Sequence, residues 1–382
     1  MLFDRRHLLQ AALAAGIAAP LHAQNYGAAP AKPAEFPPID ARSVWLVGDD
    51  GAPRNPADTA ARLATLAGDP KLRDSYLAGG AVEELEKGFA ALLGKEACAF
   101  LPTGTLANNV ALRVLCGEHP HAFCQADSHL YRDESDTAQR LSGINLVPLG
   151  SGHAAPTIAE LTAAFDAAEK GPFPLKVGAI SLESPVRRLD GQMIAPADLT
   201  AIATLAKAHG TRLHLDGARL LLAPPSIDVK AYAAPFDTVY VSLYKYLGAP
   251  FGAVLAGTAA DIARARDWRH LYGGMIYQGW APAMLALDGL KTFPATIARA
   301  HTRADELTAA LEREKLAKRR VTPAPSNIHF LEIPEARAAA AFERARVAGI
   351  RLGRWKEGTI PFFVNATILR RETAEYVALF RA

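Results

Sequence analysis

Cysteine is scarce in this chain, which has three among its 382 residues: Cys98, Cys116 and Cys124. Their positions do not have the spacing of a zinc site or of a redox pair, and we predict no metal site. We expect three buried core thiols. An oxidising compartment would also permit a disulfide between Cys116 and Cys124.

An excess of charge of one sign is also absent. The chain has 42 Lys and Arg against 39 Asp and Glu, a net charge of +3, and these charges do not gather in one segment. A nucleic-acid-binding protein would carry a clustered basic stripe. We therefore expect that this protein binds a small molecule and does not bind nucleic acid. With 50% apolar and 21% charged residues, the composition is that of a globular protein with a large core.

No apolar run is long enough to span a bilayer, which takes about 20 residues. The chain begins MLFDRRHLLQAALAAGIAAPLHAQ, which combines a short apolar run with Leu21-His22-Ala23, a sequence typical of a cleavage site. A membrane anchor or an amphipathic helix is the alternative. Because Arg5 and Arg6 are consecutive, we predict a twin-arginine signal peptide over residues 1–23. The mature protein would be periplasmic, exported already folded, and without a stable membrane anchor.

The sequence after residue 23 predicts three segments. Residues 24–70 form an N-terminal arm, 71–295 a large domain, and 296–382 a smaller α+β domain that follows a long helix near residues 294–316. In the large domain strand and helix patterns alternate, and this alternation predicts an α/β fold with a mostly parallel central sheet covered by helices on both faces. Such sheets bind their ligands beyond the carboxyl ends of the strands. The clearest strand patterns are residues 97–102, 176–183, 211–218 and 238–245, and the clearest helix patterns are 82–94, 106–118 and 195–210.

The most informative residues are Asp216 and Lys245, each at the end of a predicted strand. A lysine that ends an apolar strand is well placed to be desolvated and to attack an aldehyde. A carboxylate on the neighbouring strand is what a pyridoxal ring requires, because it keeps the ring nitrogen protonated. Taken singly, Asp216 could cap a turn and Lys245 could be a surface lysine. Together they favour pyridoxal 5'-phosphate as cofactor.

Three further positions complete the predicted site. Gly104 and Thr105 precede a helix, and their backbone N–H groups could bind a phosphate, although Thr and Gly are also ordinary helix-capping residues. His129 follows a strand-like run, where it could stack on the pyridine ring or transfer a proton; a structural histidine is the alternative. Glu183 ends another predicted strand, where it could instead hold a loop in place.

At these residues the chain resembles the low-specificity threonine aldolases of the aromatic amino-acid β-eliminating lyase family, which have fold type I of the pyridoxal-phosphate enzymes. The resemblance is carried by LHLDGARL, by YKYLGAPFGAVLAG and by DSYLAGGAVEELEKGFAALLGKEACAFLPTGTLANNVAL. It implies retro-aldol cleavage of a β-hydroxy-α-amino acid to glycine and an aldehyde. It also implies a homodimer or homotetramer with shared active sites.

Carried over by position, the resemblance assigns a role to each candidate residue. Lys245 would hold the cofactor as a Schiff base, and His129 would stack on the ring and assist proton transfer, with a bound water as the competing base. The other implied contacts are Asp216 with the ring nitrogen, Arg219 with the ring hydroxyl or the substrate carboxylate, Gly104 and Thr105 with the phosphate, and Tyr76 with the substrate. Apart from the resemblance, we predict that Ser242 contacts the cofactor and that Glu183 contacts the substrate.

The chain departs from the family pattern at four places. VWLVGDDGAP replaces the opening Ser and Asp segment, and Ile276-Tyr277-Gln278 follows the Gly-Gly-Met that usually precedes an arginine. A second active-site histidine near Glu183 has no counterpart, and Ile360-Pro361-Phe362 occupies the place of a carboxylate-binding arginine. These departures keep open β-elimination or racemisation of another amino acid, and also a non-catalytic periplasmic amino-acid-binding protein.

Overall fold

The structure, a computed structural model, describes residues 38–47, 51 and 53–381. The predicted signal peptide and the first part of the predicted arm lie outside the described residues. Within the described part, no helix combines the length and the apolar character needed to cross a membrane.

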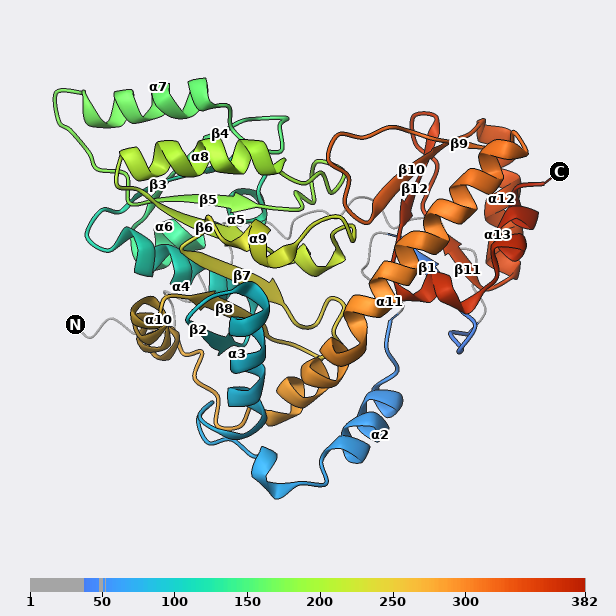
Figure 1. Cartoon of the computed structure of the whole chain (residues 1–382), viewed down its shortest axis with the longest axis horizontal. Coiled ribbons are helices and arrows are strands. Elements are labelled where there is room, and N and C mark those ends of the chain that lie inside the picture. Colours follow the sequence, from blue (N-terminus) through green and yellow to red (C-terminus); the bar gives the residue numbers. More distant parts are fainter. Residues whose placement is uncertain (1–37, 48–50, 52, 382) are drawn as a thin grey trace, which may run out of the picture. The chain divides into compact units, whose positions relative to one another are not determined.

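A seven-stranded sheet forms the centre of the large domain (Figure 1). Six strands run in one direction, and β8 alone is antiparallel to both of its neighbours. The mostly parallel sheet predicted from the sequence is therefore confirmed. In spatial order the strands are β2 (Ala97–Leu101), β8 (Ala253–Gly257), β7 (Thr238–Ser242), β6 (Arg212–Asp216), β5 (Ala179–Glu183), β3 (His121–Gln125) and β4 (Asn145–Leu149).

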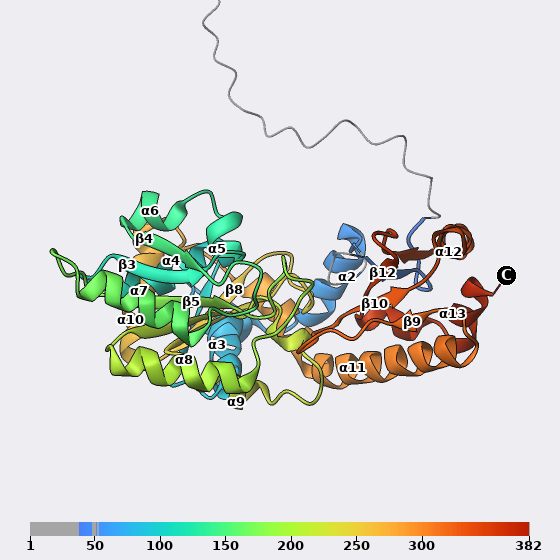
Figure 2. The same ribbon diagram turned by 90° about the horizontal axis from the view of Figure 1, so that it is seen from above.

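Helices cover both faces of this sheet because its strands are apolar on both faces. In β2 the side chains alternate: Phe100 packs into the larger core, whereas Ala99 and Leu101 pack into the smaller core on the other face. In the view from above, α6 and α8 lie on opposite sides of the sheet (Figure 2). The helices of the large domain are α3 (Gly80–Leu93), α4 (Gly104–Cys116), α5 (His129–Arg132), α6 (Thr137–Ser142), α7 (Ile158–Glu169), α8 (Pro196–Ala208), α9 (Val229–Ala233) and α10 (Ala259–Leu271), with the 3₁₀ turns η1 (Pro70–Leu72) and η2 (Leu220–Leu222).

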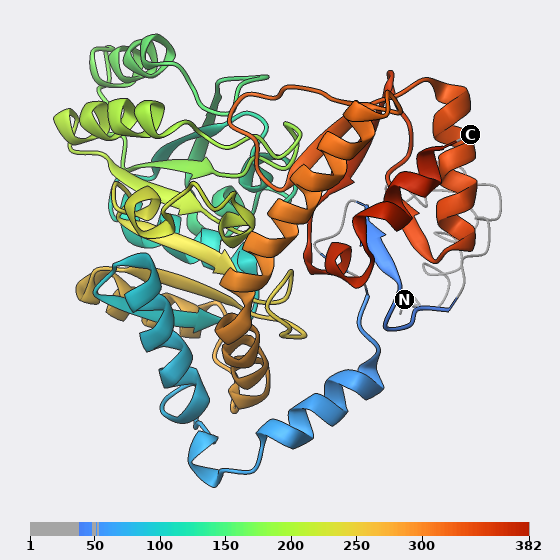
Figure 3. The same ribbon diagram turned by 45° about the vertical axis from the view of Figure 1, so that its right-hand side comes forward.

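The long helix α11 (Trp280–Arg313) contacts both the large domain and the C-terminal part of the chain, as Figure 3 shows in orange. The predicted boundary at residues 295 and 296 falls inside this helix. The C-terminal part is the smaller α+β domain expected from the sequence. Its elements are the antiparallel strands β9 (Lys318–Arg319), β10 (Ile328–Glu332) and β12 (Thr359–Phe363), with α12 (Glu335–Val347), β11 (Ile350–Leu352), η3 (Ala366–Arg370) and α13 (Thr373–Phe380).

The predicted N-terminal arm has structure of its own. Its helix α2 (Pro56–Leu66) begins after Asn55, whose side chain accepts the N–H of Ala57. Its strand β1 (Val44–Leu46) pairs in parallel with β11 of the C-terminal domain. Part of the arm is thus incorporated into the small domain.

All three cysteines are buried and free. The expectation of core thiols is confirmed, and the structure contains no disulfide between Cys116 and Cys124.

Candidate active site

A cavity of about 250 Å³ lies beyond the carboxyl ends of the parallel strands. Its walls come from residues of β5, β6 and β7 and from the segments that follow β2, β3, β6 and β7. Because parallel strands all end at the same edge, residues distant in sequence meet there. Seven of the predicted site residues line this cavity: Gly104, Thr105, His129, Glu183, Asp216, Arg219 and Lys245.

Lys245 lies in the turn that follows β7, with its Nζ atom 5.9 Å from the ring centroid of Tyr244. Ser242, the last residue of β7, is fully buried and does not line the cavity. Within the described residues its hydroxyl has no hydrogen-bond partner. A buried hydroxyl without a partner loses the hydration that it had in the unfolded chain. Because Ser242 does not line the cavity, its contact with the cofactor stays a prediction.

The first turn of α4 forms another wall of the cavity. Thr103 caps the helix and accepts the N–H of Leu106, so the ordinary capping interpretation holds for this residue. Gly104 has a separate reason to be glycine: a Cβ atom there would lie 2.5 Å from Cζ of Tyr240 and closer still to its hydroxyl. The first N–H groups of a helix have no partner within the helix. Because Gly104 and Thr105 line the cavity, their N–H groups are candidates to bind a phosphate.

Asp216 ends β6, opposite Glu183 in the sheet register, and is buried. Its Oδ1 accepts the N–H of Ala218 at 3.1 Å, and its Oδ2 accepts the side-chain amide of Asn108 at 2.9 Å. The turn interpretation of Asp216 is therefore correct for one oxygen. It does not exclude the cofactor role, because the carboxylate also lines the cavity.

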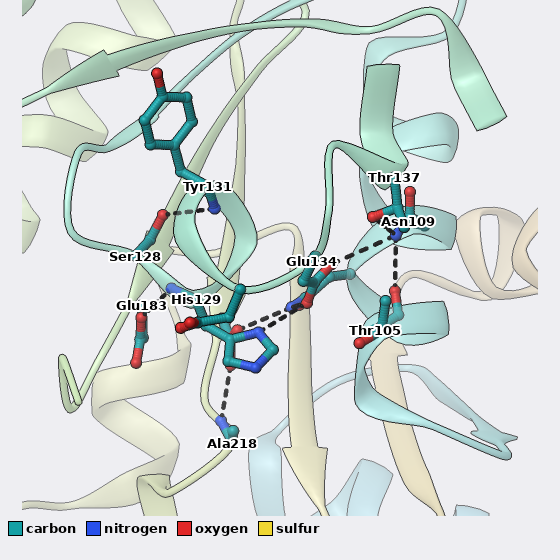
Figure 4. Close-up of polar contacts among 12 residues, drawn as sticks. Thr105, Asn109, Ser128, His129, Tyr131, Glu134, Thr137, Glu183 and Ala218 are labelled. Atoms are coloured by element: carbon teal, nitrogen blue, oxygen red, sulfur yellow. Dashed lines mark hydrogen bonds and ion pairs between the residues drawn. The ribbon is translucent and has the colours of Figure 1, made fainter. Parts of the chain in front are cut away.

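His129 begins α5 directly after Ser128, whose hydroxyl accepts the N–H of Tyr131 (Figure 4). Its backbone N–H donates to Oε2 of Glu183 at 2.6 Å, and its Nδ1 is 2.9 Å from Oε1 of Glu134 (Figure 4). The hydrogen bond with Glu134 raises the pKa of His129. With Nδ1 bound to Glu134, Nε2 is the ring nitrogen that can exchange a proton.

The cavity also concentrates buried carboxylates. Burial, together with the charge of Asp216, raises the pKa of Glu183 to about 7. Burial likewise raises the pKa of Glu134, whereas hydrogen bonds from His129 and Asn108 act against this rise. Glu134 accepts three side-chain N–H groups, those of Asn108, Asn109 and His129, and this acceptor-only pattern is that of an ionised carboxylate.

Four residues at this site were not predicted from the sequence: Asn108, Glu134, His214 and Tyr240. His214 lies two residues before Asp216 on the same strand, and Asn108 lies four residues after Gly104 on α4. The periods of a strand and a helix place both pairs on shared faces. Because they share a face with predicted site residues, His214 and Asn108 could therefore have been predicted from the sequence as part of the site.

Tyr76 does not line the cavity of its own chain. It is 58% exposed, has a positive φ of 51°, and packs edge to face against Tyr277 with ring centroids 5.3 Å apart. The contribution of Tyr76 to a neighbouring subunit's site therefore stays a prediction.

These residues fit pyridoxal phosphate. The cavity offers a lysine, a buried carboxylate for the ring nitrogen, and a helix N-terminus for the phosphate. His129, Glu134 and Asp216 also have ligand atoms within 4.8 Å of one another. However, both carboxylates already accept hydrogen bonds from the amide of Asn108, so this cluster is satisfied by protein donors.

Comparisons with known proteins agree with this geometry. A model of the Beta-eliminating lyase family matches residues 56–335. The chain is 30% identical over 259 residues to an Arabidopsis thaliana protein assigned as low-specificity L-threonine aldolase 2, covering 66% of this chain and 72% of the relative. It is 27% identical to the low specificity L-threonine aldolase of Escherichia coli K12, covering 84% and 95%. A solved Listeria monocytogenes EGD-E structure, assigned as an L-allo-threonine aldolase, aligns with a TM-score of 0.74 and 25% identity over 89% and 96% of the two chains.

Proposed function

The chain belongs to the Beta-eliminating lyase family of pyridoxal-phosphate-dependent enzymes, and we propose that it cleaves a β-hydroxy-α-amino acid to glycine and an aldehyde. The observation that supports this most directly is the cavity in which Asp216, Lys245 and the first turn of α4 meet. The relatives named as threonine aldolases support the choice of bond.

Each cavity residue has a defined task in this reaction. When bound, pyridoxal phosphate supplies the electron sink for the pair left on the substrate's α-carbon. Asp216 would hold the ring nitrogen protonated, and Arg219 would bind the substrate carboxylate. His129 accepts the β-hydroxyl proton on Nε2 while Glu134 holds its Nδ1. The bond between the α- and β-carbons then breaks, the aldehyde leaves, and protonation of the α-carbon gives glycine.

The test is release of glycine and aldehyde from L-threonine by cofactor-loaded protein, beside Lys245→Ala. Release of glycine and aldehyde in equal amounts, and only by protein that contains Lys245, would support the proposal. An unchanged visible spectrum in cofactor-loaded Lys245→Ala protein would refute the assignment of this lysine.

A second candidate reaction is β-elimination or racemisation of another amino acid. It is favoured because β12, where the family resemblance expects a carboxylate-binding arginine, contains none. In addition, Arg219 is the one arginine among the described residues that line the cavity. A keto acid and ammonia would identify elimination, and inverted substrate would identify racemisation. Tight amino-acid binding with no product would identify a binding protein.

We also propose export through the twin-arginine pathway with cleavage after Ala23. This rests on the sequence of residues 1–24. Cell fractionation of a wild-type and an Arg5→Lys, Arg6→Lys double variant tests it: the wild type should be periplasmic and begin at Gln24, and the double variant should stay in the cytoplasm.

We propose finally that two copies share their active sites, and that Tyr76 reaches the partner's cavity. Its exposed pairing with Tyr277 supports this, because an exposed aromatic pair gains most by burial at an interface. Mixing an inactive Lys245→Ala chain with an inactive Tyr76→Ala chain should restore part of the activity. No restoration in a mixed dimer would contradict the shared site.

A further inference from the structure

Next to the cavity, which Asn108 lines, lies a group of buried polar side chains. The proposed reaction uses Glu134 of this group to hold His129 but gives no task to Asn108 and His214. Asn108 on α4 and His214 on β6 are almost fully buried, as is Glu134. The Nδ2 atom of Asn108 donates to Oε1 of Glu134 at 2.8 Å and to Oδ2 of Asp216 at 2.9 Å. Its Oδ1 is 3.0 Å from Nε2 of His214. The amide therefore lies between two carboxylates and one imidazole.

The donors and acceptors of this group can be assigned from its chemistry. Two carboxylate oxygens require N–H donors, so Nδ2 of Asn108 must face them and Oδ1 must face His214. Nε2 of His214 then carries the proton, and Nδ1 accepts the hydroxyl of Thr238 at 2.9 Å. Complete burial lowers the pKa of His214 to about 4, which keeps this ring neutral and in one tautomer at neutral pH.

We propose that Asn108 is a positioning residue for the cofactor. Locked in one orientation by His214, its amide bridges Glu134 and Asp216, holds the Asp216 carboxylate toward the ring nitrogen, and connects it through Glu134 to His129. The inference rests on the cofactor of the family and not on the aldol reaction, so failure to cleave threonine would leave it standing.

The bridge matters because the two carboxylates are close. Glu134 and Asp216 present oxygens within 4.8 Å of each other, and like charges at this separation favour protonation of one of them. The two N–H groups of Asn108 offset this repulsion. Without them the repulsion between the two carboxylates is not offset, and Asp216 is no longer held as the charged partner that a protonated ring nitrogen needs.

The first experiment compares Asn108→Asp with Asn327→Asp in the full-length protein. Asp replaces Asn without a change in shape but removes both N–H donors. Asn327 is an equally buried asparagine in the small domain, where its amide donates to the carbonyl of Val364 at 2.9 Å. We expect Asn108→Asp to weaken pyridoxal-phosphate binding about 10- to 100-fold and to alter the visible spectrum of bound cofactor. We expect Asn327→Asp to leave both as in the wild type.

Equal cofactor dissociation constants and spectra for Asn108→Asp and the wild type would overturn the proposal, as would an equal loss in both variants, because the effect would then be one of general stability. A second measurement uses the wild-type protein and requires no bound cofactor. In wild-type protein labelled with ¹⁵N-histidine and lacking cofactor, His214 should remain neutral with its proton on Nε2 from pH 5 to 8. A proton on Nδ1 would mean that the amide of Asn108 faces the other way, and would also overturn the proposal.

Discussion

Replacing Glu134 with Gln separates charge from geometry at His129. The Oε1 atom that accepts from both His129 and Asn108 is retained in Gln, while the negative charge is removed. A carboxylate favours the imidazolium form, so its removal must lower the pKa of His129. Asp216 and Glu183 remain and still favour the charged ring.

The size of this shift follows from distance and exposure. Two unit charges about 4 Å apart interact by about 4 kcal/mol at an effective dielectric constant of 20, which corresponds to roughly three pH units. The His129 side chain is 34% exposed, however, and water screens the pair. We therefore expect the pKa of His129 to fall, and by less than this limit.

Two assays measure this fall. An NMR titration of His129 in the variant reports its pKa directly. If neutral His129 is the base, the acidic limb of kcat/KM should move to lower pH together with this pKa. The control is Glu86→Gln, which removes a buried carboxylate that binds the N–H of Phe100 and the side chain of Arg266. An unchanged or higher pKa for His129 in Glu134→Gln would refute the electrostatic reasoning, and a shifted pKa with an unmoved kinetic limb would refute His129 as the base.

Three other predictions follow from the structure. Gly104→Ala should weaken cofactor binding at least tenfold, because its Cβ would collide with Tyr240; adding Tyr240→Phe should recover part of the loss, and cofactor titration of both variants checks this. Burial lowers the pKa of His329 to about 3, so as the pH falls this histidine is protonated in the unfolded chain before it is protonated in the folded protein. His329 should therefore lower the free energy of unfolding by about 3 kcal/mol between pH 6.5 and pH 4. Urea unfolding should show a smaller decrease over this range in His329→Gln. Phe89→Ala should cost about 3–5 kcal/mol in the same assay, since Phe89 is fully buried in the larger core, and a cost below 1 kcal/mol would contradict its place there.

The main site residues could be predicted from local patterns. Asp216 and Lys245 each end a strand pattern, and Gly104 begins a helix after another. Because parallel strands end at one edge of the sheet, the alternation of strands and helices was sufficient to bring these three residues into one cavity. The family motifs then assigned a role to each.

Other features could not be read from local patterns. The apolar pattern of β8 fits either strand direction, and only its pairing with β2 and β7 makes it antiparallel. In the same way, nothing in Val44–Leu46 marks it as a partner of β11, more than three hundred residues later.

The sequence by itself determined the fold class, the family and seven of the residues that line the cavity, because these depend on short-range periodicity and on motifs within single segments. Only the tertiary structure brings Asn108, Glu134 and His214 together into a hydrogen-bonded group next to Asp216. These residues come from a helix, a loop and a strand. Their orientations are set by the requirement that each buried donor meets an acceptor, and that requirement can be met only once the packed elements bring the groups together.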